Sequence, residues 1–205
     1  MVRTTSSLNA SLDALAAAEP GFARVLATHG RPEPRLSDPG VATLMRTIVG
    51  QQVSVAAARS MWAKLEAAFG TPPDLARLLA ASDEELRSLG QSRQKAGYLR
   101  SLAGLVLAGD LDLADLPADD EEAVALLTQV KGIGRWSAEI YLLFAEGRGD
   151  VWPAGDLAVQ VEVGRLLGLD ERPSEKQLRA LAEAWRPHRG AAAVLAWHSY
   201  NSEPL

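Results

Sequence analysis

Two features between Gln129 and Asp156 are suited to chemistry. The first is Gly132-Ile133-Gly134, a Gly-X-Gly corner that joins two helical segments. The backbone amides from Gly132 to Arg135 would lie at a helix N-terminus, where partial positive charge favours a phosphate oxygen. The second is the carboxylate of Asp156, which follows a glycine-rich, tryptophan-containing loop. Such a carboxylate could stabilise a developing sugar cation, or orient or deprotonate an attacking water. The pairing favours DNA as the substrate.

The hairpin has two interpretations. Its glycines permit a sharp turn and the close approach of another backbone, and Val130 and Ile133 would pin the two helices together. Lys131 and Arg135 would then add positive charge beside a bound phosphate. The alternative is an ordinary corner between two helices. The hairpin taken by itself leaves both interpretations open.

Asp156 also has two interpretations. It directly precedes the apolar segment Leu157–Leu167, so it could be no more than the N-cap of that helix. The two roles are compatible, because the amides at a helix start hold a capping carboxylate in place. A fixed carboxylate is what either chemical role requires.

The elements that must hold these residues are helices. Alanine, leucine, arginine and glutamate dominate the chain, and no segment alternates convincingly between apolar and polar residues as a strand would. The pattern therefore predicts an all-α fold of about ten helices with short loops. The expected helices cover residues 12–18, 21–28, 41–49, 53–69, 82–90, 92–108, 119–130, 135–146, 157–167, 174–185 and 188–200.

Composition excludes several classes of site. The chain has 205 residues, 47% of them hydrophobic, and no cysteine, which excludes disulfides and cysteine-ligated zinc or iron–sulfur clusters. Its three histidines are dispersed without metal-ligand spacing. No apolar run approaches the roughly 20 residues that span a bilayer. Because the first residues also lack the apolar stretch of a signal peptide, we expect a cytoplasmic protein, associated with the nucleoid in a bacterium.

The charge distribution is uneven. The net charge of −5 is unfavourable for a nucleic-acid-binding protein. However, residues 110–122 contain seven acidic and no basic side chains, whereas the charged residues of 87–100 are all basic. The protein could therefore present a local basic face. Arg93 and Lys95, at the start of a predicted helix, are candidates for phosphate contacts or are simply solvated.

Three further motifs make the chain recognisable. Leu44–Ala58 reads L-M-R-T-I-V-G-Q-Q-V-S-V-A-A-A, Val130–Ala138 reads V-K-G-I-G-R-W-S-A, and Asp150–Asp156 reads D-V-W-P-A-G-D. In this order and spacing they resemble the helix–hairpin–helix DNA glycosylases of the AlkA type, the 3-methyladenine DNA glycosylase II family. Leu89–Leu99 and Trp185–Gly190 extend the resemblance, which covers roughly 41–200.

The resemblance implies a fold of two helical lobes with the active-site cleft between them. One lobe would consist mainly of residues 41–130, and the other of 1–40 plus 131–205. AlkA carries an additional N-terminal β domain, for which the roughly forty residues before Val41 are too few. Members of the family flip a damaged nucleotide out of double-stranded DNA and cut the bond between base and sugar.

The motifs also imply roles for individual residues. Asp156 matches the catalytic aspartate, and Gln52 matches the side chain that fills the vacated position in the base stack. The hairpin from Lys131 to Arg135 matches the phosphate-binding element, often with a monovalent cation, Na⁺ or K⁺, on its carbonyls. Trp136 and Trp197 match aromatic positions that line the base pocket. Trp152, in the loop before Asp156, either lines that pocket or packs the loop.

Trp136 predicts the reaction subtype. Relatives that also cleave the DNA strand have a lysine at this position, which forms a Schiff base with the sugar. Tryptophan has no amine nucleophile, so we expect a monofunctional enzyme that uses water and leaves an abasic site. Ile140 and His188 replace aromatic residues of AlkA, which could widen the base pocket.

The sequence thus predicts a monomeric glycosylase for alkylated bases such as 3-methyladenine, acting in base excision repair without a cofactor beyond the hairpin cation. Two alternatives remain. One is a helix–hairpin–helix module that binds DNA without catalysis. The other is a related glycosylase for mispaired or oxidised bases.

Overall fold

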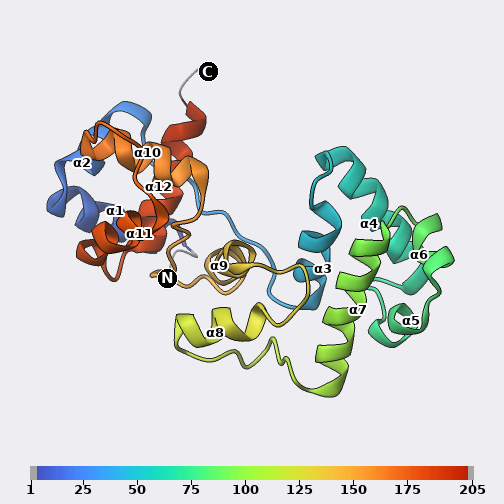
Figure 1. Cartoon of the computed structure of the whole chain (residues 1–205). Coiled ribbons are helices and arrows are strands. Elements are labelled where there is room, and N and C mark those ends of the chain that lie inside the picture. The colour runs from blue at the N-terminus through green and yellow to red at the C-terminus, as the bar shows by residue number, and fades with distance from the viewer. Residues whose placement is uncertain (1–3, 203–205) are drawn as a thin grey trace. The chain divides into compact units, whose positions relative to one another are not determined.

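The computed structural model describes residues 4–202 of the chain, and within that range it is entirely helical (Figure 1). It contains twelve α-helices and one 3₁₀ helix, with no strand in the described residues, which confirms the all-α prediction. The helices are α1 (Thr5–Ala18), α2 (Pro20–His29), α3 (Val41–Gly50), α4 (Val55–Phe69), α5 (Leu75–Ala80), α6 (Asp83–Ser88), α7 (Arg93–Ala108), α8 (Asp120–Leu127), α9 (Arg135–Phe144), α10 (Leu157–Leu167), α11 (Glu175–Leu181), η1 (Ala182–Trp185) and α12 (Arg189–Ser202).

Side-chain caps define where many of these helices begin. Ser54, Ser92 and Asp119 accept hydrogen bonds from amides in the first turns of α4, α7 and α8, which satisfies donors that a helix start leaves without a partner. Helix α5 is the element that the sequence pattern missed. It has six residues, too few for an apolar periodicity to be recognised, although Asp74 caps it.

The chain divides into two compact units. Unit 1 combines residues 1–37 with 142–205, and unit 2 is the continuous stretch 38–141. The hairpin and most of α9, residues 131–141, therefore group with unit 2, whereas the sequence resemblance placed them with the C-terminal helices. No helix in the described part of the chain is both long and apolar enough to cross a membrane.

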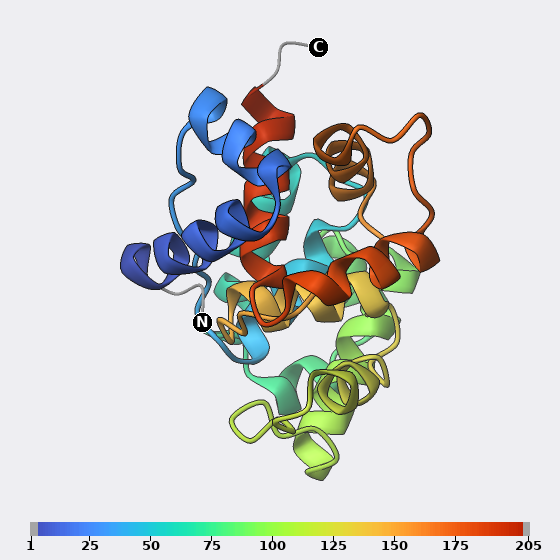
Figure 2. The ribbon, with the colours of Figure 1, turned by 90° about the vertical axis from the view of Figure 1, so that its left-hand side faces the viewer.

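Unit 1 is built around α12. Figures 1 and 2 show α12 between the α1–α2 pair and α10, and it contacts each of these helices. Its buried face is rich in small residues from Gly190 to Ala196, which lets the neighbouring backbones approach closely. Edge-to-face packing of Phe22 and Trp152 on Trp185, with centroids 5.0 and 5.6 Å apart, completes the core.

Unit 2 is organised on α7. Helices α3, α5 and α6 pack against α7, and α4 packs against α3. Leu99, Leu102 and Ala103 of α7 are buried in the resulting core. The turn between α3 and α4 and the hairpin before α9 therefore both lie against α7, which contacts Val49 through Lys95 and Gly132 through Tyr98.

Candidate functional site

The two hairpin glycines are required for different reasons. Gly132 has a φ of +85°, and a Cβ there would lie 2.1 Å from the Tyr98 ring, so both its backbone conformation and its packing demand glycine. A Cβ on Gly134 would meet no heavy atom within 4 Å. The protein itself therefore leaves space beside Gly134 for an external group to approach.

Hydrogen bonds decide which hairpin amides are available to an anion. The Ile133 amide donates to the Val130 carbonyl at 3.0 Å, and the Lys131 amide donates to Ser101 Oγ at 3.1 Å. The Ile133 amide, expected from sequence to be part of a phosphate site, is thus used within the hairpin. Among residues 4–202, the amides of Gly132, Gly134 and Arg135 have no acceptor, and those of Gly134 and Arg135 lie at the start of α9. These two are suited to an anion.

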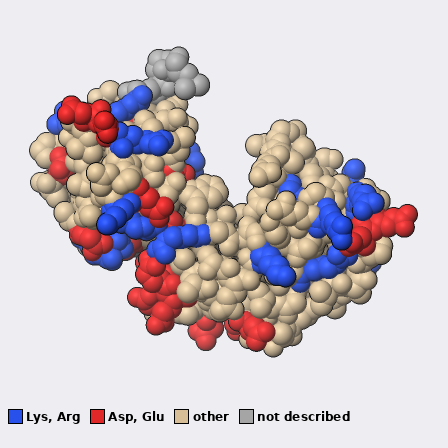
Figure 3. All heavy atoms as spheres, in the orientation of Figure 1, with Lys and Arg blue, Asp and Glu red and all other residues tan. Residues whose placement is uncertain are grey.

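The basic side chains of the hairpin differ in availability. Lys131 is exposed and forms no ion pair with any described residue. Arg135, by contrast, donates to Glu121 and, at 3.0 Å, to Glu139. The hydrogen bond to Glu121 is the main reason that the pKa of Arg135 is raised. Figure 3 shows acidic side chains gathered over α8 and the loop before it, so Lys131 is the hairpin cation best placed for a phosphate.

Gln52 lies at the tip of the turn between α3 and α4. It is exposed, and with a φ of +55° it is the one non-glycine residue of the described chain in the left-handed region. That conformation is unfavourable for a side chain with a Cβ and persists only where surrounding contacts impose it. The neighbouring Gln51 supplies such a contact, since its Nε2 donates to the Gly132 carbonyl at 2.8 Å.

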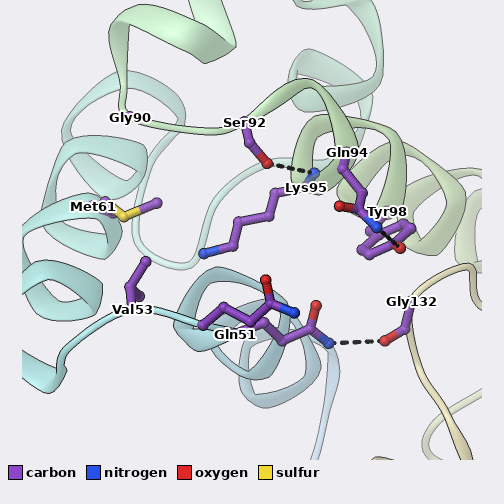
Figure 4. A pocket seen from close by; sticks show the side chains of 10 residues that line it. Gln51, Val53, Met61, Gly90, Ser92, Gln94, Lys95, Tyr98 and Gly132 are labelled. Atoms are coloured by element: carbon purple, nitrogen blue, oxygen red, sulfur yellow. Dashed lines mark hydrogen bonds between the residues drawn. The ribbon is translucent and has the colours of Figure 1, made fainter.

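A polar cavity of about 340 Å³ lies beneath this turn (Figure 4). The turn, the start of α7 and the hairpin surround it. Lys95 reaches across it from α7, and its Nζ donates to the Val49 carbonyl at 2.7 Å. The residues that line the cavity are Gln51, Gln52, Val53, Met61, Gly90, Ser92, Gln94, Lys95, Tyr98 and Gly132.

The two basic residues expected near phosphates at the start of α7 have different environments. Lys95 is only 9% exposed, and burial lowers the pKa of its ammonium group. Its hydrogen bond to Val49 makes it an internal cation, so the prediction that Lys95 contacts phosphate does not fit the structure. Arg93, the first residue of α7, is exposed and lies near Asp83, whose pKa is lowered mainly by a hydrogen bond from Arg100.

Trp136 and Ile140 occupy successive turns of α9. Residues four apart lie on one face of a helix, so the two side chains are neighbours. Trp136 is 47% exposed, unusual for so large an apolar side chain, and Ile140 is half-buried. An exposed indole next to a half-buried aliphatic residue offers a surface on which a planar group can stack.

Asp156 belongs to unit 1, where it is the N-cap of α10. Its Oδ1 accepts hydrogen bonds from the Val159 amide and from Trp197 Nε1, both at 3.0 Å. The Trp197 ring in turn packs on Phe144, with centroids 5.6 Å apart. The carboxylate is therefore fixed by one donor from its own helix and one from α12.

The loop before Asp156 is tied down by ion pairs. Asp150 accepts from Arg186 at 2.6 Å and from Arg189 at 2.9 Å, which joins the start of the loop to the segment before α12 and to the first residue of α12. Trp152 is 2% exposed and packs on Trp185, with its Nε1 directed to the Leu178 carbonyl at 3.4 Å. Trp152 thus packs the loop and does not line an open pocket, so its assignment to the base pocket is corrected.

Sequence reasoning missed the contacts that Gln51, Tyr98 and Phe144 make with the candidate residues. Phe144 could have been found, because it continues the spacing of four from Trp136 and Ile140. The contacts of Gln51 and Tyr98 with Gly132 join residues far apart in the chain, and no local pattern announces them. No group of three or more His, Asp or Glu residues suited to a metal ion exists in the described chain.

Comparison with known proteins places these features in a family context. Residues 45–187 match the HhH-GPD superfamily, described as base excision DNA repair proteins. DNA-3-methyladenine glycosylase 2 of Escherichia coli is 31% identical over 170 residues, which cover 78% of this chain and 57% of that protein. The chain thus spans little more than half the length of that relative.

Solved structures agree with the fold. A DNA-3-methyladenine glycosidase from Bacillus halodurans superposes with a TM-score of 0.85 at 29% identity, covering 98% of this chain and 92% of that one. The 3-methyladenine DNA glycosylase Mag1 of Schizosaccharomyces pombe, solved with abasic DNA, gives a TM-score of 0.76 at 26% identity, covering 93% and 95%.

Proposed function

The chain belongs to the HhH-GPD superfamily of base excision DNA repair proteins, and on that premise we propose that it is a monofunctional glycosylase for alkylated bases in duplex DNA. The observation that carries the proposal is the fixed carboxylate of Asp156, which caps α10 and accepts from Trp197. The motif resemblance assigns this residue to the family's catalytic aspartate. The relatives named for 3-methyladenine support the alkylated substrate class.

In the proposed reaction, Asp156 acts on the sugar. Alkylated purines such as 3-methyladenine carry positive charge, so the base leaves readily and positive charge develops on the sugar ring. A carboxylate held by two donors is oriented before the reaction begins, and it stabilises that charge electrostatically or accepts a proton from the attacking water. The products are the free base and an abasic site.

The damaged base must leave the helix to reach such a site. Flipping costs a few kcal/mol and is cheapest for damaged or mispaired bases, which contributes selectivity. Exposed Gln52 would fill the vacated position, while the exposed ring of Trp136 would stack on the cationic base. A cation over an indole contributes about 0.5–2 kcal/mol.

The hairpin would hold a backbone phosphate of the same DNA. The Gly134 and Arg135 amides and the Lys131 ammonium supply the donors, and the open space at Gly134 admits the phosphate. A Na⁺ or K⁺ on the hairpin carbonyls would add positive charge there. The Gly132 and Gly134 carbonyls each accept one hydrogen bond and retain a second lone pair, so their chemistry fits a hard cation.

A panel of duplexes, each with one defined lesion, tests the substrate class. Release of 3-methyladenine or a related alkylated base, together with heat-labile sites and no direct strand nicking, is the expected result. Release of only mispaired or oxidised bases would favour the alternative glycosylase. Direct nicking, or a borohydride-trapped adduct with the wild-type protein, would show that another amine attacks the sugar and would contradict the monofunctional assignment.

Asp156→Asn tests the catalytic role. Asparagine is also a good N-cap and keeps an acceptor for Trp197, so the fold should survive while base release is abolished and DNA affinity persists. Asp74→Asn is the matched control, because Asp74 caps α5 through the same kind of bond, at 2.8 Å to the Arg77 amide. A wild-type protein that binds DNA but releases no base from any lesion would favour the non-catalytic module.

A further inference from the structure

The turn that carries Gln52 is held by hydrogen bonds and only in part by packing. Val53 and Val55, at its end, are 39% and 76% exposed. Beneath the turn lies the cavity of about 340 Å³ and not a layer of packed side chains. A turn above an open cavity can relax into it, and Gln52 has a reason to do so in its left-handed conformation.

The first restraint on the turn is Gln51. Its backbone ends α3, with the amide donating to the Ile48 carbonyl at 3.3 Å, while its side chain points to the hairpin. The bond from Nε2 to the Gly132 carbonyl, 2.8 Å long, is the direct polar link between the turn and the hairpin that Figure 4 shows. Gln51 and Gln52 are consecutive, so a displacement of one moves the other.

The hairpin end of this link contacts α7. The Tyr98 ring lies against Gly132, and Ser101, one turn further along α7, accepts from the Lys131 amide. The same helix supplies the second restraint on the turn. Lys95 donates to Val49 in the last turn of α3, where carbonyls lack helical partners and a cation is favoured.

We propose that Gln51 is a positioning residue that couples the turn bearing Gln52 to the phosphate-binding hairpin, so that the two DNA contacts form as one cooperative event. The proposal rests on the function proposed above, because it presumes that both elements contact DNA. A phosphate that orders the hairpin fixes the Gly132 carbonyl and, through Gln51, the turn. Because coupling is reciprocal, insertion of Gln52 into the DNA stabilises the hairpin through the same hydrogen bond.

A double-mutant cycle measures this coupling in binding. The probe is a duplex with a tetrahydrofuran abasic analogue, and the variants are Gln52→Ala, Lys131→Ala and the double variant. If the two contacts form together, a variant that lacks one contact has already lost part of the other. The double variant should therefore bind the duplex at least about threefold more tightly than the product of the two single losses of affinity predicts. Purely multiplicative losses in the wild-type background would overturn the proposal.

The same cycle in Gln51→Met assigns the coupling to Gln51. Methionine keeps the length of the side chain and removes its donor. The losses of DNA affinity caused by Gln52→Ala and Lys131→Ala should then become multiplicative. Gln94→Met is the matched control, because Gln94 lines the same cavity but bonds to the Tyr98 hydroxyl within α7. Coupling that persists in Gln51→Met, or disappears equally in Gln94→Met, contradicts the assignment. Should Gln51→Met fail to fold, Gln51→Glu keeps the shape and removes the donor.

A third readout separates a positioning role from a structural one. Fluorescence of 2-aminopurine opposite the abasic analogue reports insertion into the stack. Gln51→Met should reduce this insertion signal at saturating protein, while its unfolding midpoint in urea stays near that of Gln94→Met. Base release by the wild type is measured in parallel. If the wild type releases the base but the affinity losses of the cycle are multiplicative, the coupling alone is overturned. If the wild type neither releases a base nor prefers the abasic duplex, the proposed function is overturned as well.

Discussion

The indole N–H of Trp197 donates to Oδ1 of Asp156 at 3.0 Å. The bond joins α12 to the first residue before α10, and it shares its acceptor with the capping bond from Val159. Trp197 was expected from the family motifs as a wall of the base pocket. Its contact with the carboxylate gives it a second proposed role, which is to orient the group that we propose acts on the sugar.

Trp197→Phe separates the two parts. Phenylalanine retains the packing on Phe144 but has no N–H for Asp156. Because a hydrogen bond to a charged group contributes roughly 1.5–3 kcal/mol, the single-turnover rate of base release should fall about tenfold or more. The affinity for an abasic-analogue duplex should change little. An unchanged rate would show that the Trp197 bond is not needed to orient the carboxylate, and Trp197→Leu would then report the packing contribution.

The two hairpin glycines give opposite expectations when each is replaced by alanine. Gly132→Ala should lower the free energy of unfolding by more than about 2 kcal/mol, because its φ is positive and the Tyr98 ring occupies the place of the new methyl group. Gly134→Ala should cost about 1 kcal/mol or less, yet weaken DNA binding, since the methyl group enters the space assigned to the phosphate. Urea unfolding and DNA titration check both. Unimpaired binding by Gly134→Ala would remove the phosphate from this position.

The salt dependence of binding should distinguish Lys131 from Arg135. Lys131 is exposed and unpaired among the described residues, so Lys131→Ala should reduce the slope of log K against log salt by about 1. Arg135 is already bonded to Glu121 and Glu139, so Arg135→Ala should change the slope less and lower stability more. Titrations at four or more salt concentrations measure the slopes. Equal slopes for the two variants would mean that Arg135 leaves its carboxylates when DNA binds.

Local patterns in the sequence predicted the features that depend on neighbouring residues. The cap of α10 by Asp156 follows from a polar residue before an apolar helical run, and the structure confirms it. The all-α class follows in the same way from composition and periodicity. The Gly132 turn was also foreseeable, because a Gly-X-Gly corner between helices needs one residue with a positive φ.

Features that depend on contacts across the chain could not be predicted. A lysine at a helix start, such as Lys95, is usually exposed, and only the packing of α3 against α7 buries it. Trp152 became core because Trp185, 33 positions later, packs on it. The bond from Gln51 to Gly132 spans 81 positions and depends on how both elements pack on α7. Residue type alone carries none of this information.

Lys95 also makes stability depend on pH in a direction that can be derived. Burial lowers the pKa of its ammonium group below the ordinary value of 10.5. Between the lowered pKa and 10.5, the unfolded chain binds more protons at this position than the folded chain does, so the contribution to the free energy of unfolding rises with pH. The stability of the wild type relative to Lys95→Met should therefore increase as the pH is raised from about 8 towards 10.5.

Urea unfolding of both proteins across this interval measures the difference, and comparison with Lys95→Met cancels the titration of all other groups. Lys64→Met is the matched control for replacing a lysine by methionine, because Lys64 is exposed on α4. A flat difference for Lys95→Met as well would mean that the hydrogen bond to the Val49 carbonyl, which favours the charged ammonium, offsets the effect of burial on its pKa.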